Sequence, residues 1–202
     1  MKTNYQLETD KITAGLAGRT EKPTLLLHSC CGPCSSYVLE YLMQYFDVTL
    51  LYYNPNIQPE AEYEKRLHYQ REVLKHLPAK ILECAYDGPA FAKIAAGYES
   101  EPEGGARCTR CFLLRLEETA KRAAAGGFDF FCTTLTVSPH KDAERINRIG
   151  AELGEACGVR WLPSDFKKRD GYLRSIRLAE QYGLYRQDWC GCQYSVSAKP
   201  SH

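Results

Sequence analysis

The sequence has no long apolar run and almost no net charge. None of its 202 residues lie in a stretch approaching the roughly 20 apolar residues of a membrane-spanning helix, so no membrane association is expected. The first 22 residues are polar and lack the apolar centre of a secretory signal, which predicts a cytoplasmic protein. A net charge of +1 neither requires nor excludes a nucleic-acid partner, because a small basic cluster is enough to bind a folded RNA locally.

Internal repeats and low-complexity segments are also missing. Apolar residues make up 44% of the chain and charged residues 25%, as in an ordinary globular protein. A chain of 202 residues is long enough for one domain with a substantial core. We therefore predict a polar extension over residues 1–22, a single α/β domain over 23–196 and a short tail over 197–202.

Cysteine, in contrast, is abundant, with ten residues. A secreted chain would use them in disulfides, but no secretory signal is present and this length does not need covalent staples. Metal binding and redox chemistry are therefore the predicted uses. Cys84, Cys132 and Cys157 stand alone and are predicted to be small buried hydrophobic residues. The other seven are clustered: Cys30, Cys31 and Cys34; Cys108 and Cys111; Cys190 and Cys192.

Strand-like apolar runs alternate with helical patterns along the chain. Runs typical of strands occur at 24–28, 48–55, 80–86, 129–137 and 159–166. Helical spacing of apolar residues occurs at 35–46, 60–77, 109–125, 140–157 and 171–182. Residues 87–106 are predicted to be less regular and to contain a loop. This alternation predicts an α/β fold with a mostly parallel sheet and helices on both faces.

Polar motifs follow four of the predicted strands. HSCCGPC follows the first strand, YYNPNI the second, TLTVSPHK the fourth and PSDFKKRD the fifth. In parallel sheets covered by helices, ligands bind at the carboxyl ends of the strands. The motifs, including the cysteine motif, are therefore predicted to converge on one rim of the sheet and to form a single active site.

The first motif places three cysteines within five positions. Adjacent side chains of a strand point to opposite sides, so Cys30 and Cys31 can serve one centre only from a turn. Gly32 and Pro33 supply such a turn, and the N-terminus of the helix beyond it favours thiolates.

A second pair, Cys108 and Cys111, stands three residues apart on one side of a predicted helix start. The spacing alone is compatible with zinc, iron–sulfur or dithiol redox chemistry. Five clustered cysteines from two distant segments exceed the four that fill a structural zinc site, which favours a polynuclear iron–sulfur centre. Zinc and metal-free thiol chemistry remain the alternatives.

The third pair, Cys190 and Cys192, is separated by a single glycine. A disulfide between them would close a small, strained ring, and strained disulfides are easily reduced. This spacing predicts a redox-active pair, with two further metal ligands as the alternative.

HSCCGPC, YYNPNI, RCTRC, TLTVSPHKD and DWCGCQYS occur in this order, and through them the chain resembles epoxyqueuosine reductases of the QueH family. The resemblance runs from about Thr24 to Ser195. It implies a HUP/PP-loop-like fold in which the cysteine motif replaces the SGGxDS loop of PP-loop ATP pyrophosphatases. ATP use is accordingly not expected.

The resemblance implies reduction of epoxyqueuosine to queuosine at the wobble position of tRNA, the last step of queuosine biosynthesis, without cobalamin. It implies a 4Fe–4S cluster and a redox-active disulfide, and a second metal nearby, for which mononuclear iron is the candidate. The implied cluster ligands are Cys30, Cys31, Cys108 and Cys111, the implied disulfide joins Cys190 and Cys192, and Cys34 is a candidate ligand of the second metal.

The implied partners are the anticodon loop of tRNA and an external electron donor; the oligomeric state is left open. Three groups of cations are candidates for phosphate contacts: Lys167, Lys168 and Arg169 with Arg174 and Arg177; Arg107 and Arg110; and Lys141, Arg145 and Arg148. Candidate proton donors by location, each with a structural role as the alternative, are His28, His140, Tyr52, Tyr53, Asp165 and Asp188. Two other functions stay open, a metal-free thiol–disulfide oxidoreductase and a zinc-stabilised nucleic-acid binding module.

Overall fold

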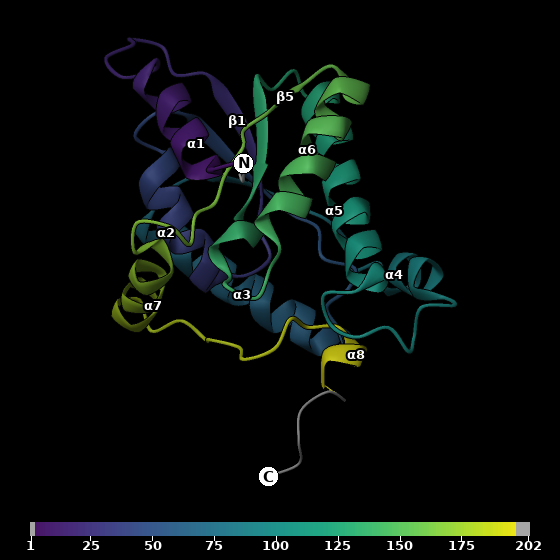
Figure 1. Ribbon diagram of the computed structural model, residues 1–202. Helices are drawn as coiled ribbons and strands as arrows, with labels where there is room; N and C mark the ends of the chain where they lie inside the picture. The colour runs from purple at the N-terminus through teal and green to yellow at the C-terminus, as the bar shows by residue number, and fades with distance from the viewer. Residues whose placement is uncertain (1–2, 197–202) are drawn as a thin grey trace.

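A computed structural model describes residues 3–196 and is built around a parallel sheet (Figure 1). Its five strands lie in the order β3-β2-β1-β4-β5, and every neighbouring pair is parallel. The strands are β1 (Thr24–His28), β2 (Asp47–Tyr52), β3 (Lys80–Glu83), β4 (Phe130–Thr133) and β5 (Arg160–Trp161). The strand order reverses between β1 and β4, and in sheets of this kind the crevice at such a point is where ligands bind.

Helices cover both faces of the sheet, as predicted (Figure 1). The helices are α1 (Tyr5–Ala14), α2 (Gly32–Leu42), α3 (Glu60–His76), α4 (Gly88–Ala95), α5 (Ala106–Ala125), α6 (Ala143–Cys157), α7 (Gly171–Gln181) and α8 (Gln193–Val196), with a short 3-10 helix η1 (Thr134–Val137) after β4. Side chains of α2, α3 and α7 pack on one face, and side chains of α5 and α6 pack on the other.

The apolar run of β1 is continuous because both of its sides are buried. Leu25 and Leu27 face the α2 and α7 layer, whereas Leu26 faces α5 and α6. All three are fully buried. The strand therefore lies in the centre of the molecule, and its carboxyl end delivers the first cysteine motif to the interior of the rim.

The predicted extension over residues 1–22 carries α1, which contacts the domain. The Thr9 hydroxyl donates to the carbonyl of Pro163 at 2.6 Å, and Asp10 forms an ion pair with Arg169. Ile12 and Leu16 pack against the core cluster that includes β1 and α2. Ile12 and Leu16 of the predicted extension thus pack on the core, and the predicted tail over 197–202 lies outside the described residues.

Several element bounds differ from the expectations. Residues 87–106 contain the expected loop after Ala95, but the segment before it is regular, because α4 forms there: Asp87 caps it by accepting a hydrogen bond from the Ala90 N–H, and Phe91 and Ala95 are buried. The fourth strand ends at Thr133 rather than at 137, because the Thr133 side chain accepts a hydrogen bond from the Leu135 N–H and starts η1. Among residues 3–196, no helix is both long and apolar enough to cross a membrane.

Candidate active site at the carboxyl rim of the sheet

The first cysteine motif forms a compact group of thiols. Cys31 is the extended residue that precedes α2, and Pro33 lies in the first turn of that helix. The sulfur atoms of Cys30, Cys31 and Cys34 all lie within 4.8 Å of one another, with 3.7 Å between Cys30 and Cys31. In the part of the chain that the structure describes, no other three His, Cys, Asp or Glu side chains bring ligand atoms so close together.

These three thiols differ in pKa. Hydrogen bonds from the Cys31 and Cys34 thiols hold the pKa of Cys30 well below its usual value. The same hydrogen bond to Cys30 raises the pKa of Cys31 to about 12, and contacts with Cys30 and Cys31 raise the pKa of Cys34. Cys30 therefore loses its proton most readily of the three, and a metal that binds all three would require each of them as a thiolate.

Cys108 and Cys111 lie in the first turns of α5, which begins at Ala106, earlier than predicted. Each is 8% exposed. Cys30 packs against the apolar cluster that contains Cys108, and the Gly104 N–H donates to the Cys108 sulfur at 3.2 Å. The two distant cysteine motifs therefore meet at the same rim.

A buried cation lies beside these thiols. Arg115, one helical turn after Cys111, is 4% exposed and donates from Nε to the Cys111 carbonyl at 3.2 Å. Burial raises the pKa of the Cys111 thiol, and the Arg115 guanidinium opposes that rise. Buried charges need compensation, so this arrangement suits a group of thiolates.

The CxC pair completes the set of sulfurs. The sulfur atoms of Cys190 and Cys192 lie 3.6 Å apart. Cys192 packs in a cluster with Cys111, Phe91 and Ala95, and Cys190 packs against it. A hydrogen bond from the Cys192 thiol, aided by the positive charge of Lys141, holds the pKa of Cys190 well below its usual value, while that of Cys192 is raised. Cys190 is therefore the more acidic thiol of the pair.

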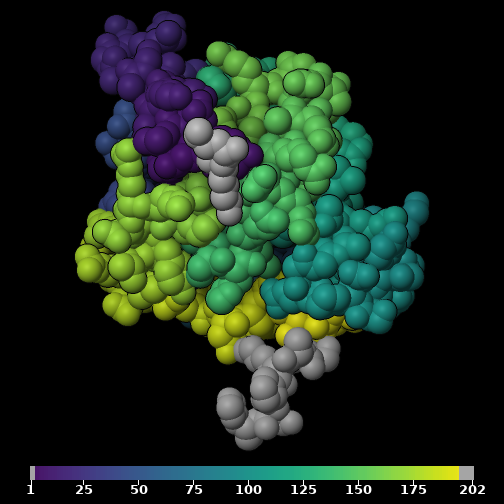
Figure 2. All heavy atoms as spheres, viewed as in Figure 1, coloured from purple at the N-terminus to yellow at the C-terminus, as the bar shows by residue number. Residues whose placement is uncertain are grey.

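The CxC loop is held from two sides. Arg66 of α3 donates to the Cys190 carbonyl at 3.2 Å. On the other side, the Cys190 N–H donates to the Ser195 hydroxyl, and that hydroxyl donates to Glu103 at 3.2 Å. Glu103 in turn lies 3.5 Å from the amine of Lys141, whose side chain is only 13% exposed. In Figure 2 the yellow C-terminal segment that carries this loop runs along the lower edge, between α7 and the teal region of α4 and α5.

His28, a candidate proton donor, is a structural residue of the rim. It is fully buried, and burial and the nearby Arg115 lower its pKa to about 4, so the ring is neutral. Its Nε2 lies 3.1 Å from the carbonyl of Tyr53 and must carry the proton, because a carbonyl can only accept. Its Nδ1 then accepts from the Thr133 hydroxyl at 2.8 Å. The ring thus ties the ends of β1 and β4 to the loop after β2.

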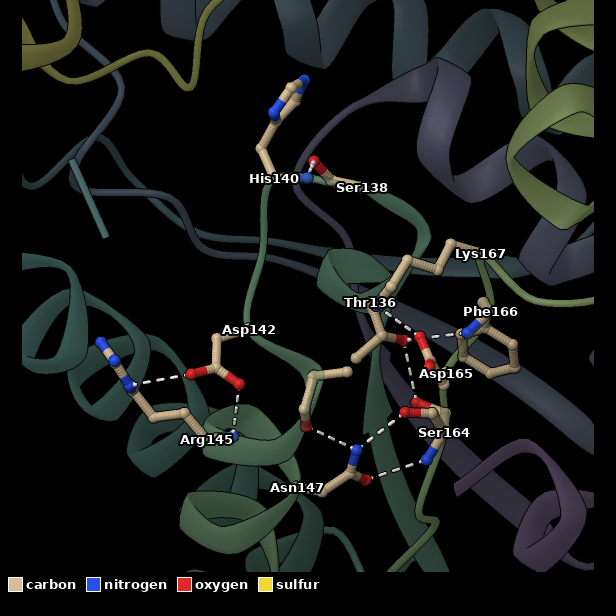
Figure 3. Close-up of polar contacts among 11 residues, drawn as sticks. Thr136, Ser138, His140, Asp142, Arg145, Asn147, Ser164, Asp165, Phe166 and Lys167 are labelled. Atoms are coloured by element: carbon tan, nitrogen blue, oxygen red, sulfur yellow. Dashed lines mark hydrogen bonds and ion pairs between the residues drawn. The ribbon is translucent and has the colours of Figure 1, made fainter. Parts of the chain in front are cut away.

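The motifs after β4 and β5 are joined by a polar network (Figure 3). The Asn147 amide donates to the carbonyls of Ala143 and Ser164 and accepts from the Ser164 N–H at 2.9 Å. The Thr136 hydroxyl lies 3.0 Å from that of Ser164 and accepts a hydrogen bond from the Phe166 N–H. These contacts hold the two segments together at the rim.

The other proton-donor candidates are scattered. Asp165 forms an ion pair with Lys167 at 2.5 Å. The His140 side chain is exposed and points away from this network (Figure 3). Tyr52 is fully buried, and its hydroxyl donates to the Tyr63 carbonyl at 3.2 Å. Asp165, His140 and Tyr52 therefore have separate surroundings.

Most of the candidate phosphate-binding cations already have partners. Arg169 pairs with Asp10 and Arg174 with Glu40. Arg107 is 2% exposed and donates to the carbonyls of Tyr98, Glu99 and Glu101, so it shapes the loop before α5.

Of the isolated cysteines, Cys132 is fully buried as predicted, whereas Cys84 and Cys157 are half-buried at the edge of the core.

The sequence interpretation missed Arg66 and Arg115. A signal for Arg66 was available: it falls three residues after Tyr63 and directly before Leu67, on the helix face predicted to be apolar. A long cation on such a face must find buried partners, and the buried face of α3 does include Arg66 and Gln70. No comparable signal pointed to the partners of Arg66, because the CxC loop lies more than 120 residues away in the sequence.

Comparison with known proteins identifies one family over most of the chain. The family model described as epoxyqueuosine reductase QueH matches residues 25–198. The chain is 40% identical to epoxyqueuosine reductase QueH of Streptococcus pyogenes serotype M1, over 97% of this chain and 81% of that protein. It is 42% identical to the Staphylococcus epidermidis protein of the same name, over 96% and 85%.

More distant proteins are also similar. The Thermotoga maritima epoxyqueuosine reductase QueH is 36% identical over 86% of this chain and 90% of that protein. Among solved structures, the U34-tRNA thiolase NcsA of Methanococcus maripaludis, with its 4Fe-4S cluster, has a TM-score of 0.49 at 14% identity, covering 94% of this chain and 67% of that chain. With the family model and the curated relatives spanning nearly its whole length, the chain belongs to the QueH family of epoxyqueuosine reductases.

Proposed function

We propose that the protein reduces epoxyqueuosine in tRNA to queuosine. The observation that carries this proposal is that the cysteine motifs at 30–34, 108–111 and 190–192 share one rim of the sheet in a chain of this family. The reaction removes the epoxide oxygen as water and consumes two electrons and two protons. As a tRNA-modifying enzyme it would act in the cytoplasm, and its RNA substrate would enter at this rim.

The four cluster ligands in this proposal are Cys30, Cys31, Cys108 and Cys111. The donor set fits an iron–sulfur cluster, since it consists of soft thiolates, two of them in the first turns of α5, with the buried Arg115 to compensate their negative charge. The Gly104 N–H directed at Cys108 is the kind of contact that stabilises a bound thiolate. A 4Fe–4S cluster held there would supply single electrons to the substrate.

Cys34 lies with Cys30 and Cys31 but outside this set of four. Its thiol is therefore free to serve as a ligand of a second metal close to the first, for which mononuclear iron remains the candidate.

The Cys190–Cys192 pair connects the site to an external electron donor. Cys190, the more acidic thiol, is the reactive member, and oxidation of the two thiols to a disulfide releases two electrons and two protons. An external dithiol restores the pair by thiol–disulfide exchange and is itself oxidised. The position of Cys192 in one cluster with Cys111 places the pair next to a proposed cluster ligand.

Iron and acid-labile sulfide analysis of anaerobically purified protein tests the proposal. The wild-type protein should be brown and contain both elements, and Ala variants of Cys30, Cys31, Cys108 and Cys111 should each lose bound iron and the reduction of epoxyqueuosine in tRNA. Cys157→Ala is the matched control, because this half-buried cysteine lies at the edge of the core on α6 and should keep both. Full iron content in all four variants, or zinc bound by the four residues, would contradict the ligand assignment.

A further inference from the structure

Arg66 of α3 is a buried cation whose donors point at the backbone of the CxC loop. Its side chain is 2% exposed and is oriented by Glu62, at 2.6 Å from Nε. The two other guanidinium nitrogens donate to the carbonyls of Cys190 at 3.2 Å and Trp189 at 3.5 Å. The guanidinium also lies 5.1 Å from the centre of the Trp189 ring. Among the described residues, the polar contacts of Arg66 beyond Glu62 are therefore with Trp189 and with Cys190, the first cysteine of the pair.

The middle residue of the pair is held in the same way. The Gln58 N–H, in the loop after β2, donates to the Gly191 carbonyl at 2.9 Å. Gly191 has a φ of +106°, a conformation that side chains rarely adopt. A Cβ at this position would also lie 2.9 Å from Nη1 of Arg66 and 3.0 Å from Ile57. Three successive carbonyls of the loop are thus fixed against α3 and the loop before it.

We propose that Arg66 is a positioning residue that holds the CxC loop ready for disulfide formation. The inference rests on the proposed redox role of Cys190 and Cys192. Their sulfur atoms lie 3.6 Å apart while both thiols are reduced, so little backbone movement is needed for the bond to form. A loop fixed in this way loses less conformational freedom on closure, which raises the effective concentration of one thiol at the other.

The chemical step is a balanced exchange with a dithiol couple. Oxidised dithiothreitol accepts two electrons and two protons from the Cys190 and Cys192 thiols, one S–S bond breaks in the reagent and one forms in the protein. The equilibrium constant of this exchange measures how well the protein arranges its two sulfurs. Loosening the loop should make the protein disulfide less stable relative to the dithiol.

The test measures this equilibrium in the full chain with its metals in place, under anaerobic conditions. After equilibration with mixtures of reduced and oxidised dithiothreitol, free thiols are alkylated and the protein is digested with trypsin. Trypsin cleaves after Arg186 but not after Lys199, which is followed by proline, so residues 187–202 stay in one peptide, and Cys190 and Cys192 are the cysteines of that segment. Mass spectrometry of this peptide gives the ratio of dithiol to disulfide without interference from the other eight cysteines.

Arg66→Met should lower the equilibrium constant for disulfide formation at least tenfold, a shift of about 30 mV for a two-electron couple. The matched control is Arg71→Met, which removes another arginine of α3 together with its ion pair to Glu83, an exposed pair in which the CxC loop takes no part. It should stay within twofold of the wild type. Equal values for Arg66→Met, Arg71→Met and the wild type would overturn the proposal, as would equal losses in both variants.

Two milder variants decide the matter if Arg66→Met does not fold. Arg66→Lys keeps the charge but not the fork that reaches both carbonyls, and Glu62→Gln weakens the contact that orients Arg66. Each should shift the equilibrium in the same direction by a smaller factor, at unchanged iron content; no shift in either would overturn the proposal. If the wild-type peptide never forms the disulfide, the proposed redox role of the pair fails instead.

Discussion

Single polar side chains at both ends of the β1–β4 pair hold the two central strands in register. At the carboxyl end, the neutral His28 ring accepts from Thr133. At the amino end, Asp129 accepts from both the N–H and the hydroxyl of Thr24, at 2.8 and 3.0 Å. The strand pair that carries Cys30 is thus fixed by side chains at its ends as well as by its ladder of backbone hydrogen bonds.

Replacing Asp129 with Asn should lower the free energy of unfolding near neutral pH. It should also make that free energy depend less on pH in the acidic range. Hydrogen bonds from the Thr24 N–H and hydroxyl, with Arg160 nearby, hold the pKa of Asp129 below its ordinary value. Stability from such a carboxyl is fully present above its unfolded pKa, about 4, and is lost as the pH falls through the lower folded value. Since Asp129 is partly exposed, we expect a loss of about 1 kcal/mol near neutral pH.

Urea unfolding of Asp129→Asn and wild type over a pH series checks this prediction. The difference in unfolding free energy between them should shrink as the pH falls below about 4. A difference that stays constant down to about pH 2 would mean that the charge of Asp129 does not contribute.

Serine at either position of the CxC pair should separate electron delivery from metal binding. Cys190→Ser and Cys192→Ser should both keep their iron, because neither residue belongs to the proposed ligand set. Each should complete at most a single turnover with a thiol reductant, since no disulfide can form. Loss of iron from either variant would identify the pair as metal ligands.

At the scale of elements, two close approaches determine how helices lie on the sheet. A Cβ on Gly150 of α6 would come within 2.3 Å of the Trp161 ring in β5. One on Gly171, the first residue of α7, would come within 2.0 Å of the Phe166 carbonyl and 2.4 Å of Tyr37 in α2. The rim geometry depends on both approaches, because α6 and α7 follow the polar motifs after β4 and β5.

Gly150→Ala should therefore destabilise the protein despite its higher helix propensity. The added methyl must displace the indole of Trp161, and its Nε1, which donates to Asn147 at 3.0 Å, moves with it. We expect a loss of about 1–3 kcal/mol in the free energy of unfolding, measured by urea denaturation. Glu152→Ala on the same helix is the control, because its pair with Arg148 is 65% exposed on both sides and should change stability by less than about 0.5 kcal/mol. A Gly150→Ala variant as stable as the control would show that α6 can move away from β5 at little cost.

Strands and helices were largely predictable from the sequence, but their ends were not. The first strand was predicted at 24–28 and is β1, and the helix predicted at 60–77 is α3 with one residue fewer. The fifth strand was predicted at 159–166, yet only Arg160–Trp161 pairs with β4. Hydrophobic runs report burial, and the segment beyond the Leu162 N–H, which still donates to the Phe131 carbonyl of β4 at 2.9 Å, is buried without forming part of the strand: Leu162 and Phe166 are in the core.

At the scale of the whole molecule, exposed cations on the rim side predict the face that meets RNA. Lys167, Lys168 and Arg169 follow β5 on the rim side, but Lys167 pairs with Asp165 and Arg169 with Asp10. Both cations stay partly accessible despite their ion pairs: the exposed fraction of the side chain is 24% for Lys167 and 62% for Arg169. The three residues remain the predicted phosphate contacts, in competition with these carboxylates.

Reversing Lys167, Lys168 and Arg169 together to Glu should raise the KM for tRNA while leaving iron content unchanged. Each phosphate contact with single-stranded RNA contributes roughly 0.7 to the slope of log affinity against log salt concentration. If all three residues contact phosphates, the variant should therefore have a slope that is shallower by about 2. The control variant replaces Arg19, Lys22 and Lys80 together with Glu. It makes the same change of charge near the amino ends of β1 and β3. Equal salt slopes for the two triple variants would direct the search to Arg110 and Arg148, which are exposed.

The sequence by itself determined the α/β architecture and the placement of the cysteine motifs after strands, because hydrophobic period and turn residues are local properties. Only the tertiary structure decided which sulfurs become neighbours. Cys30 packs against the cluster that contains Cys108, and Cys111 shares a cluster with Cys192. It also decided that Arg66 holds a carbonyl 124 residues further along the chain. Such pairings arise from how helices pack on the two faces of the sheet. A local sequence pattern does not predict them, because the two partners of each contact lie far apart in the sequence.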